Sequence, residues 1–163
     1  MQAFCKSRMH LNGGSLSGTA SGQRAEIRGQ RLEIRQMQIS SATELTVYKK
    51  AYALAMRVFE ISKSFPPEER YSLTDQMRRS SRSVCSNLRE GWAKRRYPSH
   101  FVSKLTDADG ENGETDTWLD FAKDCGYVTV ERHNELKAIS AEVGKMLGAM
   151  IHDPSGFVLT SDR

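Results

Sequence analysis

The segment from Arg78 to Arg96 carries seven basic side chains and a single acidic one. If the segment is helical, four of its arginines fall within about 40° of one another and form a row about 27 Å long. These four are Arg78, Arg82, Arg89 and Arg96. Guanidinium groups match the geometry of phosphate oxygens, so such a row could follow a nucleic-acid backbone. Arg79, Lys94 and Arg95 point elsewhere and broaden the positive field. Of these three, Arg79 is assigned below to structure or interfaces. The candidate nucleic-acid-binding residues are therefore Arg78, Arg82, Arg89, Lys94, Arg95 and Arg96.

The alternative is that these cations pair with acids of the same chain or of a second copy. A later segment carries Asp107, Glu111 and Glu114 at helical spacing, with Trp118 next on the same face. A basic helix and an acidic helix can pair within a subunit or across an interface. Residues 94–96 could also stabilise the negative C-terminal end of their own helix. The pattern leaves pairing and nucleic-acid contact open, and the two can coexist.

A second group of residues has a structural interpretation. Gly91 inside a helix costs about 1 kcal/mol against alanine, which indicates a close approach of another helix. Asn87 and Glu90 are interpreted as buried polar groups that set register or oligomer geometry. The residues assigned to structure or interfaces are Arg79, Asn87, Glu90, Gly91, Asp107, Glu111 and Glu114.

The sequence contains no constellation typical of an enzyme. Di-iron bundles use Glu-x-x-His pairs, and His100, His133 and His152 have no glutamate three residues before them. The stretch ADGENG lacks the lysine of a phosphate-binding loop and the ligand spacing of a calcium loop. Three scattered cysteines do not form a zinc site or a disulfide framework, and Cys85 and Cys125 are interpreted as buried hydrophobic residues. We expect no catalytic residue, no metal, no cofactor and a cytoplasmic location.

The net charge of +4 is concentrated near the N-terminus. Residues 1–40 contain six basic and two acidic residues, whereas the remainder contains eighteen of each. This balance excludes a uniformly basic nucleic-acid-binding body, so such a function requires segregated charge. Residues 1–42 are rich in Gly, Ser, Gln and Arg, and we predict a disordered tail or, if translation starts at Met37, a largely untranslated segment. The sequence contains no run of eighteen apolar residues, so it predicts no membrane-spanning helix.

From residue 43 onward, apolar residues recur at steps of three and four, which predicts helices throughout. Pro66, Pro98, Gly126 and Pro154 divide the pattern into four helices, with Ser72 and Thr129 as N-caps of the second and fourth. Matched lengths and short connections predict an all-α, up-down-up-down four-helix bundle over residues 43–152. A flexible C-terminal tail is expected over residues 153–163. The core row predicted on the second helix is Leu73, Met77, Ser80, Val84, Leu88 and Gly91, and that on the third is Phe101, Leu105, Ala108, Asn112, Thr115, Leu119 and Ala122. The first helix has two apolar rows, the first with Leu45, Tyr48, Tyr52, Ala55 and Phe59 and the second with Val47, Ala51, Leu54, Val58 and Ile61. One bundle core needs only one such row, so the second row suggests a subunit contact.

Two stretches, YSLTDQMRRSSRSVCSNLREGW and ADGENGETDTWLDFAKDCGYV, resemble the four-helix-bundle family of 23S rRNA-intervening-sequence proteins. That family includes the accessory variability proteins of diversity-generating retroelements. Its second helix reads Leu-x-x-Gln-x-x-Arg and then Ser-Ile-x-x-Asn-Ile-x-Glu-Gly, matched here by Leu73, Gln76, Arg79, Ser83, Val84, Asn87, Leu88, Glu90 and Gly91. Its third-helix pattern is matched by Ala108, Gly110, Glu114, Asp116, Thr117, Gly126 and Tyr127. Glu111 and Thr115 depart from the third-helix pattern, where they replace a serine and a leucine, and Cys85 departs from the second-helix pattern, where it replaces a frequent proline.

The resemblance covers the chain from Leu45 to Ile151 and implies a ring-like homopentamer. Retroelement relatives bind nucleic acid and a reverse transcriptase, whereas the molecular function of most members is unknown, so the resemblance bears on fold more than on function. The combined hypothesis is a non-enzymatic oligomer that binds structured RNA or DNA through the basic row. The alternative is a homo-oligomeric scaffold that binds a protein, such as a reverse transcriptase, with the charged rows at interfaces. The expected partners are other copies, RNA or DNA, and a protein, but no membrane.

Overall fold

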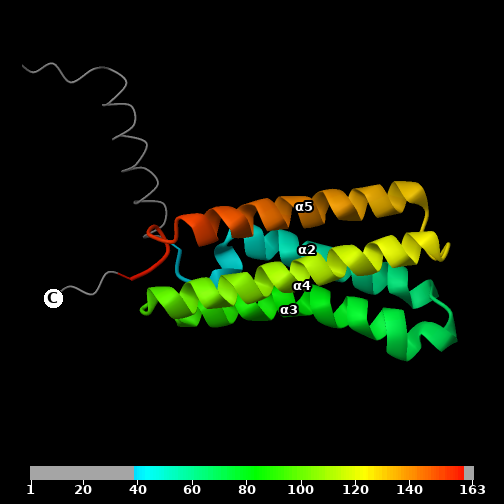
Figure 1. Cartoon of the computed structure of the whole chain (residues 1–163), viewed down its shortest axis with the longest axis horizontal. Helices are drawn as coiled ribbons and strands as arrows, with labels where there is room; N and C mark the ends of the chain where they lie inside the picture. The colour runs from blue at the N-terminus through cyan, green and yellow to red at the C-terminus, as the bar shows by residue number, and fades with distance from the viewer. Residues whose placement is uncertain (1–38, 160–163) are drawn as a thin grey trace, which may run out of the picture.

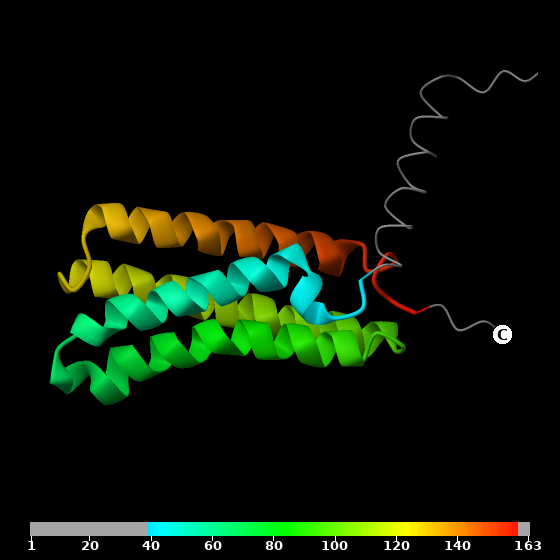
Figure 2. The same ribbon diagram turned by 180° about the vertical axis from the view of Figure 1, so that it is seen from behind.

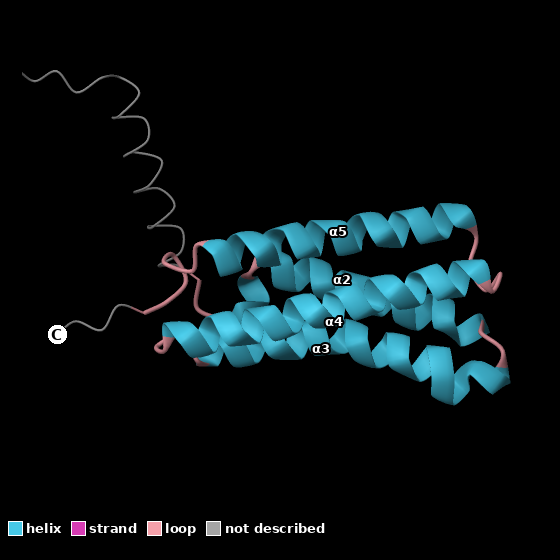
Figure 3. Ribbon diagram, viewed as in Figure 1, coloured by secondary structure: helices cyan, strands magenta, loops and turns pink. Residues whose placement is uncertain are grey.

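Four long helices pack side by side in the computed structural model, which describes residues 39–159 (Figure 1). They are α2 (Thr46–Ile61), α3 (Asp75–Ala93), α4 (Pro98–Asp124) and α5 (Val130–His152). Each helix contacts its neighbour along the chain, and α5 returns to contact α2, as the reverse view also shows (Figure 2). Within the described residues there is no strand (Figure 3). The predicted all-α, up-down-up-down four-helix bundle is confirmed.

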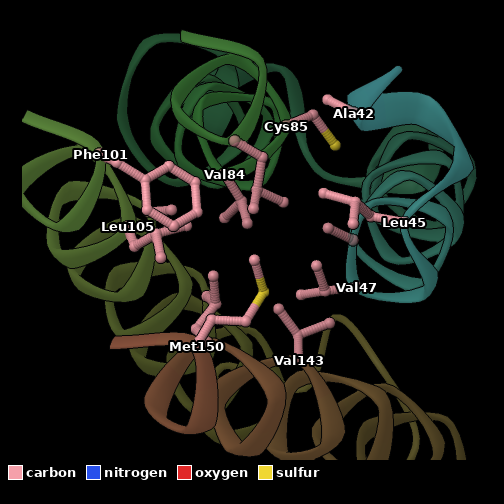
Figure 4. Packing of buried hydrophobic residues seen from close by; sticks show 13 residues of the cluster. Ala42, Leu45, Val47, Val84, Cys85, Phe101, Leu105, Val143 and Met150 are labelled. Carbon is pink, nitrogen blue, oxygen red and sulfur yellow. The ribbon is translucent and has the colours of Figure 1, made fainter. Parts of the chain in front are cut away.

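The core is formed by one buried face of each helix. In the close view of one end of the bundle, side chains from all four helices point toward a common centre (Figure 4). The row predicted on the second helix is buried in full and comprises Leu73, Met77, Ser80, Val84, Leu88 and Gly91. The same holds for the third helix, with Phe101, Leu105, Ala108, Asn112, Thr115, Leu119 and Ala122. Helical periodicity therefore identified the buried faces of α3 and α4.

The polar residues within these buried rows have hydrogen-bond partners inside the bundle. The hydroxyls of Ser80 and Thr115 lie 2.9 Å apart between α3 and α4. Asn112 Nδ2 donates to the carbonyl of Ser140 on α5 at 3.1 Å. Buried polar groups with hydrogen-bond partners avoid most of the desolvation cost, so Thr115 is accommodated in the core.

A glycine brings α3 and α4 together near one end of the bundle. Gly91 is buried, and a Cβ added to it would lie 3.3 Å from Lys104 Cβ and 3.6 Å from the ring of Phe101. Glycine is the residue that leaves room for this approach. The close helix contact predicted at Gly91 is confirmed.

The start of α3 differs from the prediction. Ser72 does not cap the helix, because it lies inside a π-helical turn, η4 (Arg70–Thr74). Glu69 caps η4, and its carboxylate accepts the hydroxyl of Ser72 and the backbone N–H of Leu73, the latter at 3.3 Å, whereas Thr74 at the N-cap of α3 makes no side-chain cap hydrogen bond. These hydrogen bonds lower the pKa of Glu69. Thr129 caps α5 as predicted, accepting the N–H of Arg132.

Both ends of the packed body extend beyond the predicted range. Residues 153–159, which we assigned to a flexible tail, contact the bundle: the rings of Phe157 and Phe101 lie 6.3 Å apart, and the N–H of Leu159 donates to the carbonyl of Arg95. Ala42, placed in the N-terminal tail, is buried. The disordered or untranslated segment predicted before residue 39 lies outside the described residues, as do residues 160–163.

One cysteine was placed correctly and one was not. Cys85 is buried, and burial raises the pKa of its thiol to about 11. Cys125 is exposed, because it follows the last residue of α4, beyond the buried row. No helix of residues 39–159 is both long enough and apolar enough to cross a lipid bilayer.

The close contact at Gly91 predicts that a glycine-to-leucine substitution lowers stability there but not at an open glycine of the same bundle. We expect Gly91→Leu to lower the free energy of unfolding by about 1–3 kcal/mol, because the added atoms overlap Lys104 and Phe101. The control is Gly148→Leu on α5, where an added Cβ meets nothing within 4 Å and stability should stay constant or rise by up to about 1 kcal/mol. Urea unfolding measures both variants. Equal free energies of unfolding for the two variants would contradict the close contact at Gly91.

Candidate nucleic-acid interface

Two arginines of the predicted row lie on the edge of α3 that faces α2. The guanidinium carbon of Arg78 lies 5.0 Å from the ring centroid of Phe59 on α2, and that of Arg82 lies 5.8 Å from the same centroid. Arg78 is half-buried, and its Nε donates to Ser62 Oγ at 2.7 Å. Lys63 Nζ lies 4.7 Å from the same ring. Three cations therefore surround one aromatic side chain.

Arg89 continues this row, whereas Arg96 does not. Arg89 is exposed on the same face of α3, two helical turns beyond Arg82. Since α3 ends at Ala93, Arg96 lies in the turn before α4, so the predicted 27 Å row is too long. The physical cause is Pro98, which disfavours helical geometry in the residue before it. Arg96 is nevertheless exposed.

The remaining cations near the end of α3 occupy different environments. Lys94 is exposed at the C-cap, where its backbone N–H bonds to the last carbonyls of the helix. Arg95 folds back over Trp92, with its guanidinium carbon 4.0 Å from the indole centroid. Arg95 is therefore partly engaged within the chain, and Lys94 and Arg96 are freely accessible.

None of the arginines of α3 forms a salt bridge with another described residue. The acids that were expected to pair with them lie on the opposite edge of α3, along α4. Pairing of the arginine row with these acids within one subunit, one of the two interpretations left open by the sequence, does not occur in the described chain. Pairing across an interface between copies remains a hypothesis.

That opposite edge is held together by Lys104 of α4. Its Nζ lies 3.0 Å from Glu90 and 3.1 Å from Asp107, and it donates to Asn87 Oδ1 at 3.3 Å. Within one subunit Asn87 is half-buried and Glu90 is exposed, so neither is a core residue, and their burial in an oligomer stays a prediction. The reason is their position at the rim between α3 and α4, outside the core row. Arg79, also exposed, donates to Gln76.

Acidic side chains line a shallow hollow on the same edge. Its lining residues are Asn87, Asp107, Gly110, Glu111 and Glu114. Desolvation and the nearby charges of Glu114 and Asp107 raise the pKa of Glu111, and the charge of Arg79 partly offsets them. Glu114 accepts the indole N–H of Trp118 at 3.0 Å. Negative charge is therefore crowded on this edge and positive charge on the other.

Two tyrosines and a methionine of α2 extend the arginine-bearing edge outside the core. Tyr52 is 54% exposed and Met56 is 43% exposed. The ring of Tyr48, half-buried, stacks against that of Tyr52 with centroids 6.4 Å apart. The row that suggested a subunit contact, with Val47, Ala51, Leu54 and Val58, is buried in the core, so the row that contains Tyr48, Tyr52 and Phe59 is the one left near the surface. We call the surface formed by Tyr48, Tyr52, Met56, Phe59, Arg78, Arg82 and Arg89 the α2–α3 edge.

The other polar cluster of the bundle is an ionic network between α4 and α5. His133 Nε2 lies 2.7 Å from Asp120, and Lys137 Nζ lies 2.9 Å from the same carboxylate and 2.5 Å from Asp116. The hydrogen bonds from Lys137 and His133 lower the pKa of Asp120. Among residues 39–159, no group of three or more His, Cys, Asp or Glu side chains could hold a metal ion. We interpret the network as a link between the two helices.

Comparisons with known proteins agree with the four-helix fold. The family described as "23S rRNA-intervening sequence protein" matches residues 43–149. A crystal structure of a protein of unknown function from the S23 ribosomal protein family of Bacteroides thetaiotaomicron is 28% identical in sequence, with a TM-score of 0.59. The alignment covers 65% of this chain and 95% of that one. No curated protein matches the chain.

The crowding of acids predicts the effect of neutralising Glu111. Because the folded state raises its pKa, the ionised carboxylate destabilises the fold at neutral pH, and this cost disappears as pH falls through the folded pKa toward its ordinary value of 4.5. Glu111→Gln should therefore raise the free energy of unfolding at pH 7, by less than about 1 kcal/mol. The gain should vanish near pH 4.

Thermal unfolding across this pH range measures the effect. The control is Glu68→Gln, the same change at an exposed site remote from the acidic hollow. A loss of stability at pH 7 in Glu111→Gln would contradict the prediction and would indicate that a cation, either Arg79 of the same chain or one from another copy, stabilises the ionised Glu111.

Proposed function

This chain belongs to the family of 23S rRNA-intervening sequence proteins, and on that premise we propose that it binds structured RNA or DNA through the α2–α3 edge. The proposed role is non-enzymatic, with recognition of phosphates by Arg78, Arg82 and Arg89, and with Lys94 and Arg96 extending the contact past the end of α3. The cytoplasmic location remains a prediction from the cysteine content.

The observation that carries the proposal is the cluster of unpaired guanidinium groups on one edge. Arg82 and Arg89 are exposed and form no salt bridge with a described residue, and Arg78 is oriented by Ser62. Like charges held close together repel one another, and an anion placed between them relieves this repulsion. Phosphate is a strong partner, since a charge-assisted hydrogen bond from arginine is roughly twice as strong as a neutral one.

The segregation of charge supports this orientation of the protein on a nucleic acid. The acidic hollow along α4 lies on the other side of α3, where it would repel a phosphate backbone. The nucleic acid is therefore expected on the α2 side. Contacts of this kind mainly position a protein and carry little base specificity.

A second candidate function follows from the same charge distribution. The basic edge and the acidic hollow lie on different edges of one subunit, so the basic edge of one copy could contact the acidic hollow of the next in a head-to-tail manner. Such contacts close into a ring when the rotation between copies permits. The protein would then be a homo-oligomeric scaffold, a pentamer by the resemblance, that binds a protein partner elsewhere.

Fluorescence anisotropy with a labelled RNA hairpin separates the two functions. We expect the full chain to bind with an affinity that falls steeply with salt, because each neutralised phosphate contributes about −0.7 to −0.9 to the logarithmic slope. The double variant Arg82→Ala, Arg89→Ala should bind at least about tenfold more weakly at low salt, with a slope smaller in magnitude by about 2.

The matched control is Arg57→Ala, Arg132→Ala, which removes the same charge from two arginines that lie near Glu135. It should bind like the parent, and light scattering should show all three proteins in the same oligomeric state. Equal loss in both double variants would indicate non-specific attraction. Failure of the parent to bind at low salt, or dissociation of its oligomer by the Arg82→Ala, Arg89→Ala pair, would favour the scaffold.

A further inference from the structure

The aromatic and basic rows of the α2–α3 edge are in register. Phe59 and Arg82 are in contact, with 5.8 Å between ring centroid and guanidinium carbon. Tyr52 precedes Phe59 by seven residues, and Arg89 follows Arg82 by seven residues. Because α2 and α3 run antiparallel, both steps lead about 10.5 Å in the same direction along the bundle. Tyr52 and Arg89 therefore lie near the same level along the bundle, one heptad away from the contact of Phe59 with Arg78 and Arg82.

The two steps of this ladder differ in accessibility. At the first step, Phe59 is half-buried beneath the three cations that surround it. At the second step, Tyr52 is 54% exposed, and Arg89, near the same level on α3, is exposed as well. Tyr48 stacks on Tyr52 with 17° between the ring planes, which restricts the orientation of the exposed ring. The edge thus combines a cationic anchor with an open aromatic platform.

The cationic anchor is well suited to one phosphate group. Of the three cations around Phe59, Lys63 has a carboxylate partner, Glu60, at 2.7 Å. Arg78 and Arg82 have no salt-bridge partner among residues 39–159, and the hydrogen bond to Ser62 holds Arg78 in place. A phosphate between two such guanidinium groups can accept several charge-assisted hydrogen bonds.

We infer that the α2–α3 edge recognises unpaired nucleotides, with a base stacked on Tyr52 and the flanking phosphates bound by Arg82 and Arg89. This inference rests on the proposed function and narrows its ligand to RNA or DNA that exposes a loop, a bulge or a single strand. A base inside a duplex is covered on both faces by its neighbours, so it cannot reach the tyrosine. Stacking accepts any base, because every base has a π face.

The test compares two labelled RNAs that carry the same number of phosphates: a hairpin with an unpaired loop and a fully paired duplex. The full chain should bind the hairpin more tightly. Tyr52→Ala should weaken hairpin binding about fivefold to a hundredfold, the range for loss of one stacked base, and leave duplex binding unchanged. Tyr52→Phe keeps the ring and should stay within about twofold of the parent. Phe121→Ala, an equally exposed aromatic on α4 at 53%, is the matched control.

The other outcomes separate failure of the stacking inference from failure of the proposed function. If Tyr52→Ala leaves hairpin binding unchanged while Arg82→Ala, Arg89→Ala abolishes it, the stacking inference is wrong and the proposed function stands. Equal weakening of hairpin and duplex by Tyr52→Ala also overturns the inference. Dissociation of the oligomer by Tyr52→Ala identifies the aromatic row as a subunit contact instead. If the parent binds neither RNA, the proposed function itself fails.

Discussion

Burial of a single face of α3 is the constraint on which the rest of the structure depends. Its core row, which includes Met77, Val84 and Leu88, is nearly inaccessible to solvent, and Gly91 brings α4 into close contact at one end. Burying these apolar side chains contributes on the order of 1.5–3 kcal/mol each, far more than any exposed ion pair. Hydrophobic packing therefore sets the rotation of α3, and the charged residues take the positions that this rotation leaves to them.

That rotation separates the charges of a nearly neutral body into two edges. Arg82 and Arg89 emerge beside α2, next to aromatic side chains, whereas Glu90 emerges beside α4, where Lys104 links it to Asp107. The pairs on the α4 side are satisfied within the chain. The cations on the α2 side make no ion pair with a described residue, so they contribute little to the stability of the fold and are left to act on a ligand or on a second copy.

Sequence periodicity anticipated the buried rows of α3 and α4 because the contrast between apolar and polar residues repeats at 3.6 residues per turn. Periodicity could not tell whether the arginines of α3 would face α2 or α4. A helical wheel gives the angle of each residue from the core, but the side on which each neighbouring helix lies depends on the handedness of the bundle. The contact of Arg82 with Phe59 was missed for this reason. Two other differences have local causes. Glu69, and not Ser72, is the capping residue before α3, at the start of η4. The helix α3 ends before Arg96, because the coming Pro98 disfavours helical geometry in the residue before it.

The most direct test of the α2–α3 edge as the nucleic-acid face is photo-crosslinking of the full chain to an RNA hairpin that carries 4-thiouridine in its loop, with the adducts mapped by mass spectrometry. No substitution is needed, so the native charge distribution and assembly are preserved. We expect adducts on the peptides that contain Tyr52 and Arg82–Arg89, and none on the α4 segment around Glu111. Adducts confined to α4 and α5, or no adducts above those of a non-binding protein, would contradict the assignment of this edge.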